Sequence, residues 1–242
     1  MTNSILTVKN VYKSFKVGKQ SVPVLKNVSF EVKDGDFLVI YGPSGCGKST
    51  LLHGILGLEA PTQGSINFLA HELYSSSQTE DTRTSFRKEH IGMVYQQPNW
   101  IKSLTVLENV AFPLSLLGIP SFKREGLALE FLKKVGMENW KAYVPSELSS
   151  GQQQKVALAR ALITNPRVII ADEPTGNLDF ESGQDLMNTL KELNQKEKRT
   201  IIMVTHDLEY LKYANRTVKM LDGEITDKDV EEKNISYKRK HE

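Results

Sequence analysis

A glycine-rich run between an apolar segment and an amphipathic one constrains this chain more than any other feature. The run reads Gly42-Pro43-Ser44-Gly45-Cys46-Gly47-Lys48-Ser49-Thr50 and matches the pattern G-x-x-x-x-G-K-[ST]. Residues 37–41 before it are apolar almost throughout, which predicts a strand buried on both faces. Leucine and isoleucine then recur at helical spacing over residues 49–58. The sequence therefore predicts a strand, a tight loop and a helix in succession.

This arrangement predicts a binding site for the phosphates of a nucleoside triphosphate. Glycines let the backbone turn so that successive N–H groups point at phosphate oxygens, and the helix adds the positive end of its dipole. Lys48 would place a charge at the β- and γ-phosphates, and the Ser49 hydroxyl can bind Mg²⁺. A glycine-rich turn without a ligand is the alternative, but the flanking strand and helix argue against it.

Three polar residues follow two further apolar segments that are predicted to be strands. Asp172 and Glu173 end the run 168–171, and His206 comes shortly after the run 201–204. Ligands of α/β sheets bind at the carboxyl ends of strands. We expect Asp172 to hold Mg²⁺ through its water shell, Glu173 to deprotonate a water molecule, and His206 to donate to the γ-phosphate. Solvated acids and a structural histidine are the alternatives.

The composition indicates a globular protein of 242 residues, with 39% hydrophobic and 25% charged residues. A net charge of 31 − 29 = +2 gives no electrostatic reason to expect a nucleic acid partner. The single cysteine, Cys46, excludes an intramolecular disulfide and favours a reducing compartment. The N-terminus lacks the apolar core of a signal peptide. The longest apolar candidate, residues 110–119, is interrupted by Pro113 and is shorter than the ~20 residues of a membrane span. These features predict a cytoplasmic protein.

The chain reads as one domain of the α/β class with an inserted helical subdomain. Residues 1–97 contain alternating strand patterns and residues 98–160 are mainly helical. Residues 161–225 return to strands alternating with helices and end in a hairpin at Asp222-Gly223. The polar segment 75–84 is predicted to be a loop or the start of a helix. The tail 226–242 mixes both charge signs, has little apolar content and is predicted to be mobile.

The segment Leu148-Ser149-Ser150-Gly151-Gln152 opens a predicted helix and makes the chain resemble the ATP-binding cassette (ABC) ATPases. Six motifs of that family occur here in family order, and the resemblance spans residues 5 to 225. They are the phosphate loop, Gln96, the signature at 148–152, Asp172-Glu173, Asn177-Leu178-Asp179 and His206. The resemblance implies a mixed-sheet core, an N-terminal antiparallel β subdomain and a helical subdomain that carries the signature.

The resemblance also implies how nucleotide would be bound. ATP on the phosphate loop of one copy would be closed over by Ser149, Ser150, Gly151 and Gln152 of a second copy, in a head-to-tail dimer around two ATP–Mg²⁺. Hydrolysis would use Glu173 as base, Lys48 as a countercharge and His206 as a donor. Gln96 would contact Mg²⁺ and the attacking water, with Gln97 as the rival. Ser49 and Asp172 complete the metal site, and Asp179 the nucleotide site. Phe15 would stack on adenine, with Tyr12 as the alternative.

Ser150 departs from the family pattern, which has glycine at this position. A positive φ there would strain serine by roughly 1–2 kcal/mol. Alternatively, Ser150 to Gln153 reads as a capping box, in which Ser150 would be the N-cap. We therefore expect a working signature.

Residues 95–97, 104–110 and 172–179 look most like the branch of lipoprotein-release, macrolide-export and FtsE-like cell-division ATPases. This resemblance implies a separate permease with few membrane helices and a large extracytoplasmic domain. The ATPase would lie on the inner face of the cell membrane. Trp100-Ile101 would face the permease or pack in the core. The alternatives are a soluble ABC ATPase of DNA repair or translation, and a regulatory ATP-binding module, against which Glu173 and His206 argue. For the basic cluster 238–240 we favour a solvated tail over lipid contact.

Overall fold

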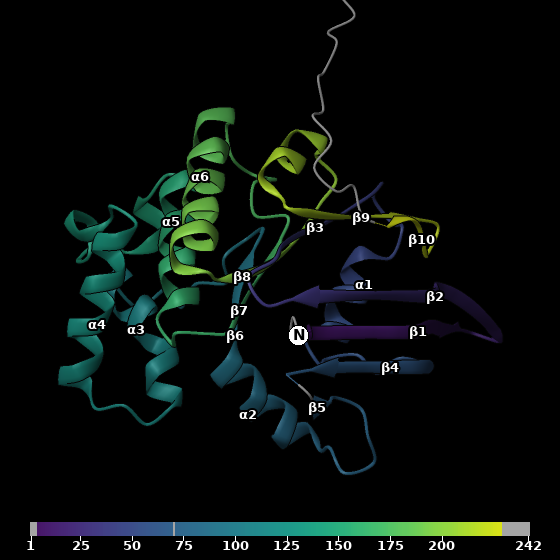
Figure 1. The fold of residues 1–242 in the computed structure, drawn as a ribbon. Coiled ribbons are helices and arrows are strands. Elements are labelled where there is room, and N and C mark those ends of the chain that lie inside the picture. Colours follow the sequence, from purple (N-terminus) through teal and green to yellow (C-terminus); the bar gives the residue numbers. More distant parts are fainter. Residues whose placement is uncertain (1–3, 70, 229–242) are drawn as a thin grey trace, which may run out of the picture.

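The computed structural model describes residues 4–69 and 71–228, with a central six-stranded sheet (Figure 1). Its strand order is β10-β9-β3-β8-β7-β6, and all neighbours are parallel except β10, which is antiparallel to β9. The sheet is therefore mixed, as predicted. Its strands are β3 (Phe37–Tyr41), β6 (Ile91–Tyr95), β7 (Val168–Asp172), β8 (Thr200–Thr205), β9 (Arg216–Leu221) and β10 (Glu224–Lys228).

A second, antiparallel sheet has the order β2-β1-β4-β5. It consists of β1 (Ser4–Val17), β2 (Gln20–Lys33), β4 (Gln63–Phe68) and β5 (His71–Glu72). β1 and β2 form a long hairpin that extends well beyond the predicted alternating segments, Ile5 to Val8 and Val28 to Val32. This sheet is the antiparallel subdomain that the resemblance implied.

The helices lie on both faces of the central sheet (Figure 1). The phosphate-loop helix α1 (Lys48–Ile55) lies on the same side as the antiparallel sheet, and α3 to α6 lie on the other side. These four are α3 (Val106–Leu116), α4 (Ser121–Lys134), α5 (Ser150–Leu162) and α6 (Phe180–Glu197). The remaining helices are α2 (Glu80–His90) and the 3₁₀ turns η1 (Glu138–Trp140), η2 (Pro145–Glu147) and η3 (Leu208–Tyr213).

The apolar runs of the central strands explain this layering. In β3, Phe37 and Val39 belong to the core formed with α3 to α6, whereas Leu38 and Ile40 belong to the core formed with α1 and the antiparallel sheet. Side chains alternate between the two faces of a strand, so a continuous apolar run is needed where both faces are covered. Each fully buried side chain of this size stabilises the fold by about 1.5–3 kcal/mol. The predicted buried strand at residues 37–41 is confirmed.

α3 runs through Pro113, the residue that interrupts the apolar run 110–119, and begins with a capping box between Thr105 and Glu108. Residues 75–79 form a loop and residues 80–84 open α2, so the prediction of a loop or the start of a helix is confirmed; no residue of α2 is buried. One expectation needs correction. β10 continues to Lys228, beyond the predicted start of the tail at 226, and residues 229–242 with the basic cluster lie outside the described residues. In the described part of the chain, no helix combines the length and apolar character of a membrane span.

Candidate nucleotide-binding site

Two glycines of the phosphate loop stand where a side chain would collide with neighbouring backbone. A Cβ at Gly42 would run into the carbonyl oxygen of Met220 on β9. A Cβ at Gly47 would lie 3.0 Å from the Val24 carbonyl oxygen, and Gly47 has a φ of 102°, in the region that favours glycine. The loop is thus packed between β9 and β2, and its glycines permit that approach.

The start of α1 fits an anionic ligand. Gly47 is the N-cap and offers no side-chain cap, and the first turn carries no acidic residue. The first N–H groups of a helix have no partner within the helix, and the dipole makes them attractive to phosphate. The Lys48 ammonium is buried and donates to the carbonyls of Gly42 at 2.8 Å and Pro43 at 2.9 Å, so the loop wraps around it. Ser49 is exposed beside it.

Strand register brings the other predicted residues to the same edge of the sheet. Tyr41 of β3 pairs with Thr205 of β8, and Asp172 of β7 pairs with both Val204 of β8 and Tyr95 of β6. Because these strands are parallel, their carboxyl ends lie together. The phosphate loop, His206, the acidic pair 172–173 and Gln96 therefore follow four adjacent strands at one edge.

Glu173 and His206 form a close pair. Nδ1 of His206 lies 2.6 Å from Oε2 of Glu173, and the Glu173 N–H donates to the Val204 carbonyl at 2.9 Å. Glu173 has a φ of 45°, which is uncommon for a residue other than glycine and costs about 1–3 kcal/mol. With Nδ1 on the carboxylate, Nε2 of His206 is left for a ligand.

Asp172 is half-buried, and its carboxyl group has a perturbed affinity for protons. Burial, followed by the adjacent Glu173 carboxylate, raises the pKa of Asp172, while His53 and Lys48 lower it. Among the described residues no trio of His, Cys, Asp or Glu is arranged to hold a metal ion. Mg²⁺ commonly takes one or two carboxylates and completes its shell with water and substrate phosphates. Asp172 together with Ser49 fits that requirement.

Gln96 lies directly after β6 and is in contact with the loop that follows Glu173. A Cβ at Gly176 would lie 2.6 Å from Nε2 of Gln96, and Nδ2 of Asn177 donates to the Gln96 carbonyl at 3.4 Å. These contacts place Gln96 beside the loop that follows Glu173, and its contact with Mg²⁺ stays a prediction.

The signature opens α5, but its cap differs from the predicted one. The N-cap is Ser149, whose hydroxyl accepts the Gln152 N–H at 3.3 Å, while Oε1 of Gln152 accepts the Ser149 N–H at 2.9 Å. The predicted box from Ser150 to Gln153 is therefore wrong by one position. Ser150 lies in the first helical turn without a positive φ, so the expected strain is absent.

The signature is packed against the start of α6 rather than against the phosphate loop. A Cβ at Gly151 would lie 2.6 Å from Oγ of Ser182. Asp179 is the N-cap of α6 and accepts the N–H and hydroxyl of Ser182, both at 2.9 Å, which lowers the pKa of Asp179. Its carboxylate thus has a capping role without nucleotide. The signature helix α5 and the phosphate-loop helix α1 lie on opposite faces of the central sheet (Figure 1).

Phe15 lies on the side of the β1–β2 hairpin that faces α1. Lys13 lines a small cavity with Thr50 of α1, and its ammonium lies 5.0 Å from the centre of the Phe15 ring. Tyr12 precedes Lys13 on the strand, and its carbonyl accepts the Thr62 N–H. The two rings are about equally exposed, at 38% and 37%, so stacking of Phe15 on adenine stays a prediction.

Sequence reasoning missed Gln154, which is 2% exposed and donates to the Tyr95 carbonyl at 2.8 Å. This bond links the signature helix to the residue before Gln96. Helical spacing could have revealed it, because Gly151, Gln154, Leu158 and Ala161 share the buried face of α5. A lone amide on an apolar face predicts a specific partner, since buried polar groups are hydrogen-bonded.

Known proteins of one family are similar to this chain in sequence and fold. A sequence profile described as "ABC transporter" matches residues 25–176. The chain is 44% identical over 223 residues to an uncharacterized ABC transporter ATP-binding protein, MJ1508, of Methanocaldococcus jannaschii, covering 92% of this chain and 98% of that one. It is 42% identical to YvrO of Bacillus subtilis, similarly named, covering 91% of this chain and 95% of the relative.

Solved structures of ATP-binding cassettes are also similar to this chain. The ATP-binding cassette MJ0796, as a dimer bound to ADP and Pi in a post-hydrolysis state, matches with a TM-score of 0.85 and 39% identity, covering 93% of this chain and 97% of that one. The cbiO1 protein of Clostridium perfringens, part of the transporter complex cbiONQ, matches with a TM-score of 0.82 and 29% identity, covering 92% of this chain and 87% of that one. The chain therefore belongs to the ABC transporter family, as one of its ATP-binding cassettes.

Proposed function

We propose that this chain is the ATP-hydrolysing subunit of a membrane ABC complex, working as a head-to-tail pair of identical copies around two ATP–Mg²⁺. The observation that carries the proposal is the separation of two anion-binding helix ends. α1 begins on one face of the central sheet and the signature helix α5 packs on the other. A single chain cannot close its signature over its own phosphates, but a second, inverted copy can. The dimeric form of the similar cassette MJ0796 supports this arrangement.

The residues at the sheet edge suit in-line attack of water on the γ-phosphorus. Glu173 would accept the proton of the attacking water, and Nδ1 of His206, 2.6 Å away, would orient that carboxylate. Lys48 would turn from its loop carbonyls to the phosphate oxygens. Asp172, Ser49 and Gln96 would hold Mg²⁺, which neutralises charge on the phosphates. The bond between the γ-phosphorus and the oxygen that bridges it to the β-phosphate would break as the water oxygen bonds to the γ-phosphorus.

A groove beside Gln96 is the proposed docking surface for the permease. It encloses about 490 Å³ between α2, β6, α3 and α5. Its walls combine apolar side chains with cationic ones and contain no carboxylate among the described residues; the apolar ones include Ile91, Met93, Ile101, Phe112 and Leu116, and the cations are Arg87, Lys88 and Arg160. This lining suits a short amphipathic segment of a membrane protein. The transporter complex that contains cbiO1 supports a permease partner.

Trp100 is held by internal contacts at the edge of this region. Its Nε1 donates to Oε1 of Gln153 at 2.9 Å, and the Arg160 guanidinium lies 4.4 Å from its ring centre. These contacts favour the packing alternative for Trp100. Ile101, which lines the groove, is the better candidate for direct contact with a permease.

Glu173→Gln tests the catalytic part of the proposal. The amide keeps the size of the side chain but cannot take a proton from water. We expect ATP binding to persist, steady-state hydrolysis to fall by at least about a hundredfold, the scale of general-base catalysis, and an ATP-dependent dimer to appear in size-exclusion chromatography. Hydrolysis near the wild-type rate would reassign the base. Absence of hydrolysis in the wild-type chain would favour the regulatory alternative.

Purification from detergent-solubilised membranes, followed by mass spectrometry, tests the partner. A permease with few membrane helices and a large extracytoplasmic domain would support the lipoprotein-release and macrolide-export branch and a place on the inner face of the membrane. A permease with many helices would retain the transport function and overturn the branch. Soluble partners alone would favour the DNA-repair or translation alternative.

A further inference from the structure

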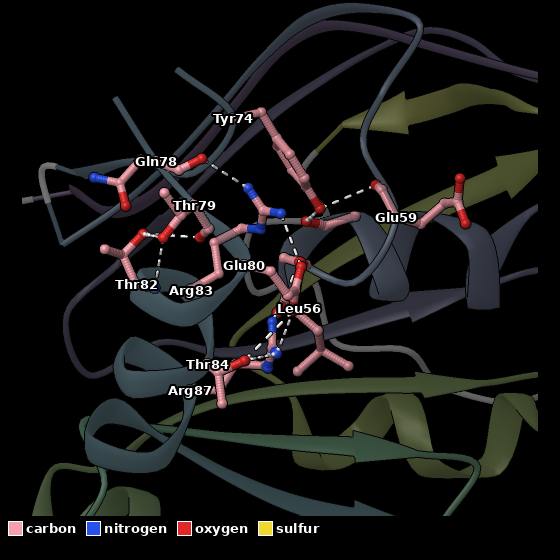
Figure 2. Close-up of polar contacts among 12 residues, drawn as sticks. Leu56, Glu59, Tyr74, Gln78, Thr79, Glu80, Thr82, Arg83, Thr84 and Arg87 are labelled. Carbon is pink, nitrogen blue, oxygen red and sulfur yellow. Dashed lines mark hydrogen bonds and ion pairs between the residues drawn. The ribbon is translucent and has the colours of Figure 1, made fainter. Parts of the chain in front are cut away.

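Helix α2 holds the far end of the phosphate-loop helix through Arg87 (Figure 2). Nη1 of Arg87 donates to the Leu56 carbonyl at 3.4 Å and to the Gly57 carbonyl at 3.2 Å. Leu56 is the C-cap of α1. The last carbonyls of a helix lack partners within the helix, and a guanidinium satisfies them and suits the negative end of the dipole. Arg87 therefore caps α1 from a different element.

The position of this guanidinium is determined by an ion pair on its own helix. Nη2 of Arg87 donates to Oε1 of Glu80 at 2.8 Å and to Oγ1 of Thr84 at 2.6 Å. The other carboxylate oxygen of Glu80 accepts Nη2 of Arg83 at 2.8 Å. Hydrogen bonds from Arg87 and then Arg83 lower the pKa of Glu80 to about 2, so the carboxylate is ionised at neutral pH. Arg87 is held at both ends of its guanidinium.

A movement of one end of α1 is transmitted to the other. The helix has eight residues and is therefore only about 12 Å long. Its first turn supplies Lys48 and the phosphate-facing N–H groups, and its last turn leads into the carbonyls that Arg87 holds. A rod of two turns has no internal hinge, so its tilt sets the direction of the N–H groups at the phosphate loop.

Arg87 also lines the groove beside Gln96. α2 leads into β6 without an intervening residue, from His90 to Ile91, and β6 ends one residue before Gln96. The Arg87 side chain thus borders the groove, while its Nη1 donates to the carbonyls at the end of α1. A groove occupant that displaces the guanidinium changes the support of the phosphate loop.

We propose that Arg87 is a positioning residue that fixes the tilt of α1 and couples the groove to the phosphate loop. The coupling part rests on the proposed function, because it takes the groove to be the docking surface of the permease. The positioning part concerns the isolated chain alone.

Calorimetric titration of the full chain with ADP and Mg²⁺ tests the positioning part without hydrolysis. We expect Arg87→Gln to raise the Kd for ADP about tenfold, or 1.4 kcal/mol, because the phosphate-facing N–H groups lose their alignment. Arg83→Gln is the matched control: it removes a guanidinium that is bound to the same Glu80 but donates to the Gln78 carbonyl, and it keeps the Cβ and Cγ methylene groups of Arg83, which lie near Gly57. Its Kd should stay within about twofold of the wild type, by the same scale.

Circular dichroism at the titration temperature confirms folding of each variant. If Arg87→Gln does not fold, Arg87→Lys takes its place, since lysine can reach a carbonyl but cannot bridge it to Glu80. Its Kd should lie above that of the control. A Kd equal to that of Arg83→Gln, in whichever Arg87 variant folds, would overturn the proposal.

Stimulation of ATP hydrolysis in the purified permease complex tests the coupling part. We expect the ratio of complexed to free activity to fall toward one in Arg87→Gln and to persist in Arg83→Gln. Equal stimulation in both variants would overturn the coupling. If no permease is found, the proposed function fails while the ADP affinities still decide the positioning role, so the two failures are distinguishable.

Discussion

Asn109 on α3 anchors the segment that follows Gln96 through hydrogen bonds, and replacing it with alanine should lower the free energy of unfolding. Oδ1 of Asn109 accepts the Ile101 N–H at 3.0 Å. Nδ2 lies 3.1 Å from the Ile101 carbonyl and 3.0 Å from the carbonyls of Leu104 and Thr105. The side chain is 1% exposed, so water cannot replace these partners.

The expected loss follows from the hydrogen-bonding capacity of the side chain. Nδ2 carries two hydrogens, so it serves two of its three carbonyls at a time, and Oδ1 adds a third bond. At about 1 kcal/mol net for each bond, Asn109→Ala should lower the free energy of unfolding by about 3 kcal/mol. For a chain of this size that corresponds to a decrease in Tm of about 6–12 °C.

Thermal unfolding followed by circular dichroism measures this loss. Asn188→Ala, on the exposed face of α6, is the matched control and should change the stability by less than about 0.5 kcal/mol. A decrease in Tm below about 2 °C for Asn109→Ala would refute the reasoning, because it would mean that the loop finds equivalent partners when the amide is removed.

Three other substitutions or treatments give independent tests. A bulky maleimide should label Cys46 slowly, because the thiol is buried, and abolish nucleotide binding, with protection by ATP; labelled protein with undiminished hydrolysis would contradict this. Asp172→Asn should raise the Tm at neutral pH without Mg²⁺ or nucleotide. Because the pKa of Asp172 is raised in the folded state, the wild type loses stability as pH rises from the unfolded pKa of about 3.9 through the folded pKa. The difference in Tm between variant and wild type should therefore vanish in acid. A difference in Tm that is the same at every pH would point to another cause. Gly176→Val should lower the rate of ATP hydrolysis while leaving the Tm close to that of the wild type, since its Cβ would displace the Gln96 side chain. A large decrease in Tm together with the lost activity would show a general packing defect.

The sequence predicted the central layers because each feature there has a local pattern. Apolar runs at 37–41, 168–171 and 201–204 predict strands buried on both faces, and parallel strands place their carboxyl ends together. The phosphate loop, Asp172, Glu173 and His206 each follow such a run, so their shared edge could be anticipated before any distance was known.

The extent of α2 could not be predicted from the sequence, because its residues give no apolar periodicity. It is stabilised by Glu80, which pairs with Arg83 and Arg87, and by contacts with the end of α1. Pro113 interrupts the apolar run without ending the helix: a proline removes one helical hydrogen bond, but the capping box of Thr105 and the packing of α3 outweigh that loss.

The sequence by itself predicted the phosphate loop and the acidic strand end from local patterns, and its resemblance to the ABC ATPases added the signature. Tertiary structure alone decided that Ser149 rather than Ser150 caps the signature helix, that Gln154 reaches Tyr95, and that Arg87 holds α1. Periodicity reports which side of a helix is buried, whereas these contacts depend on how neighbouring elements are positioned to within an ångström. That positioning arises from the packing of many residues distant in the chain.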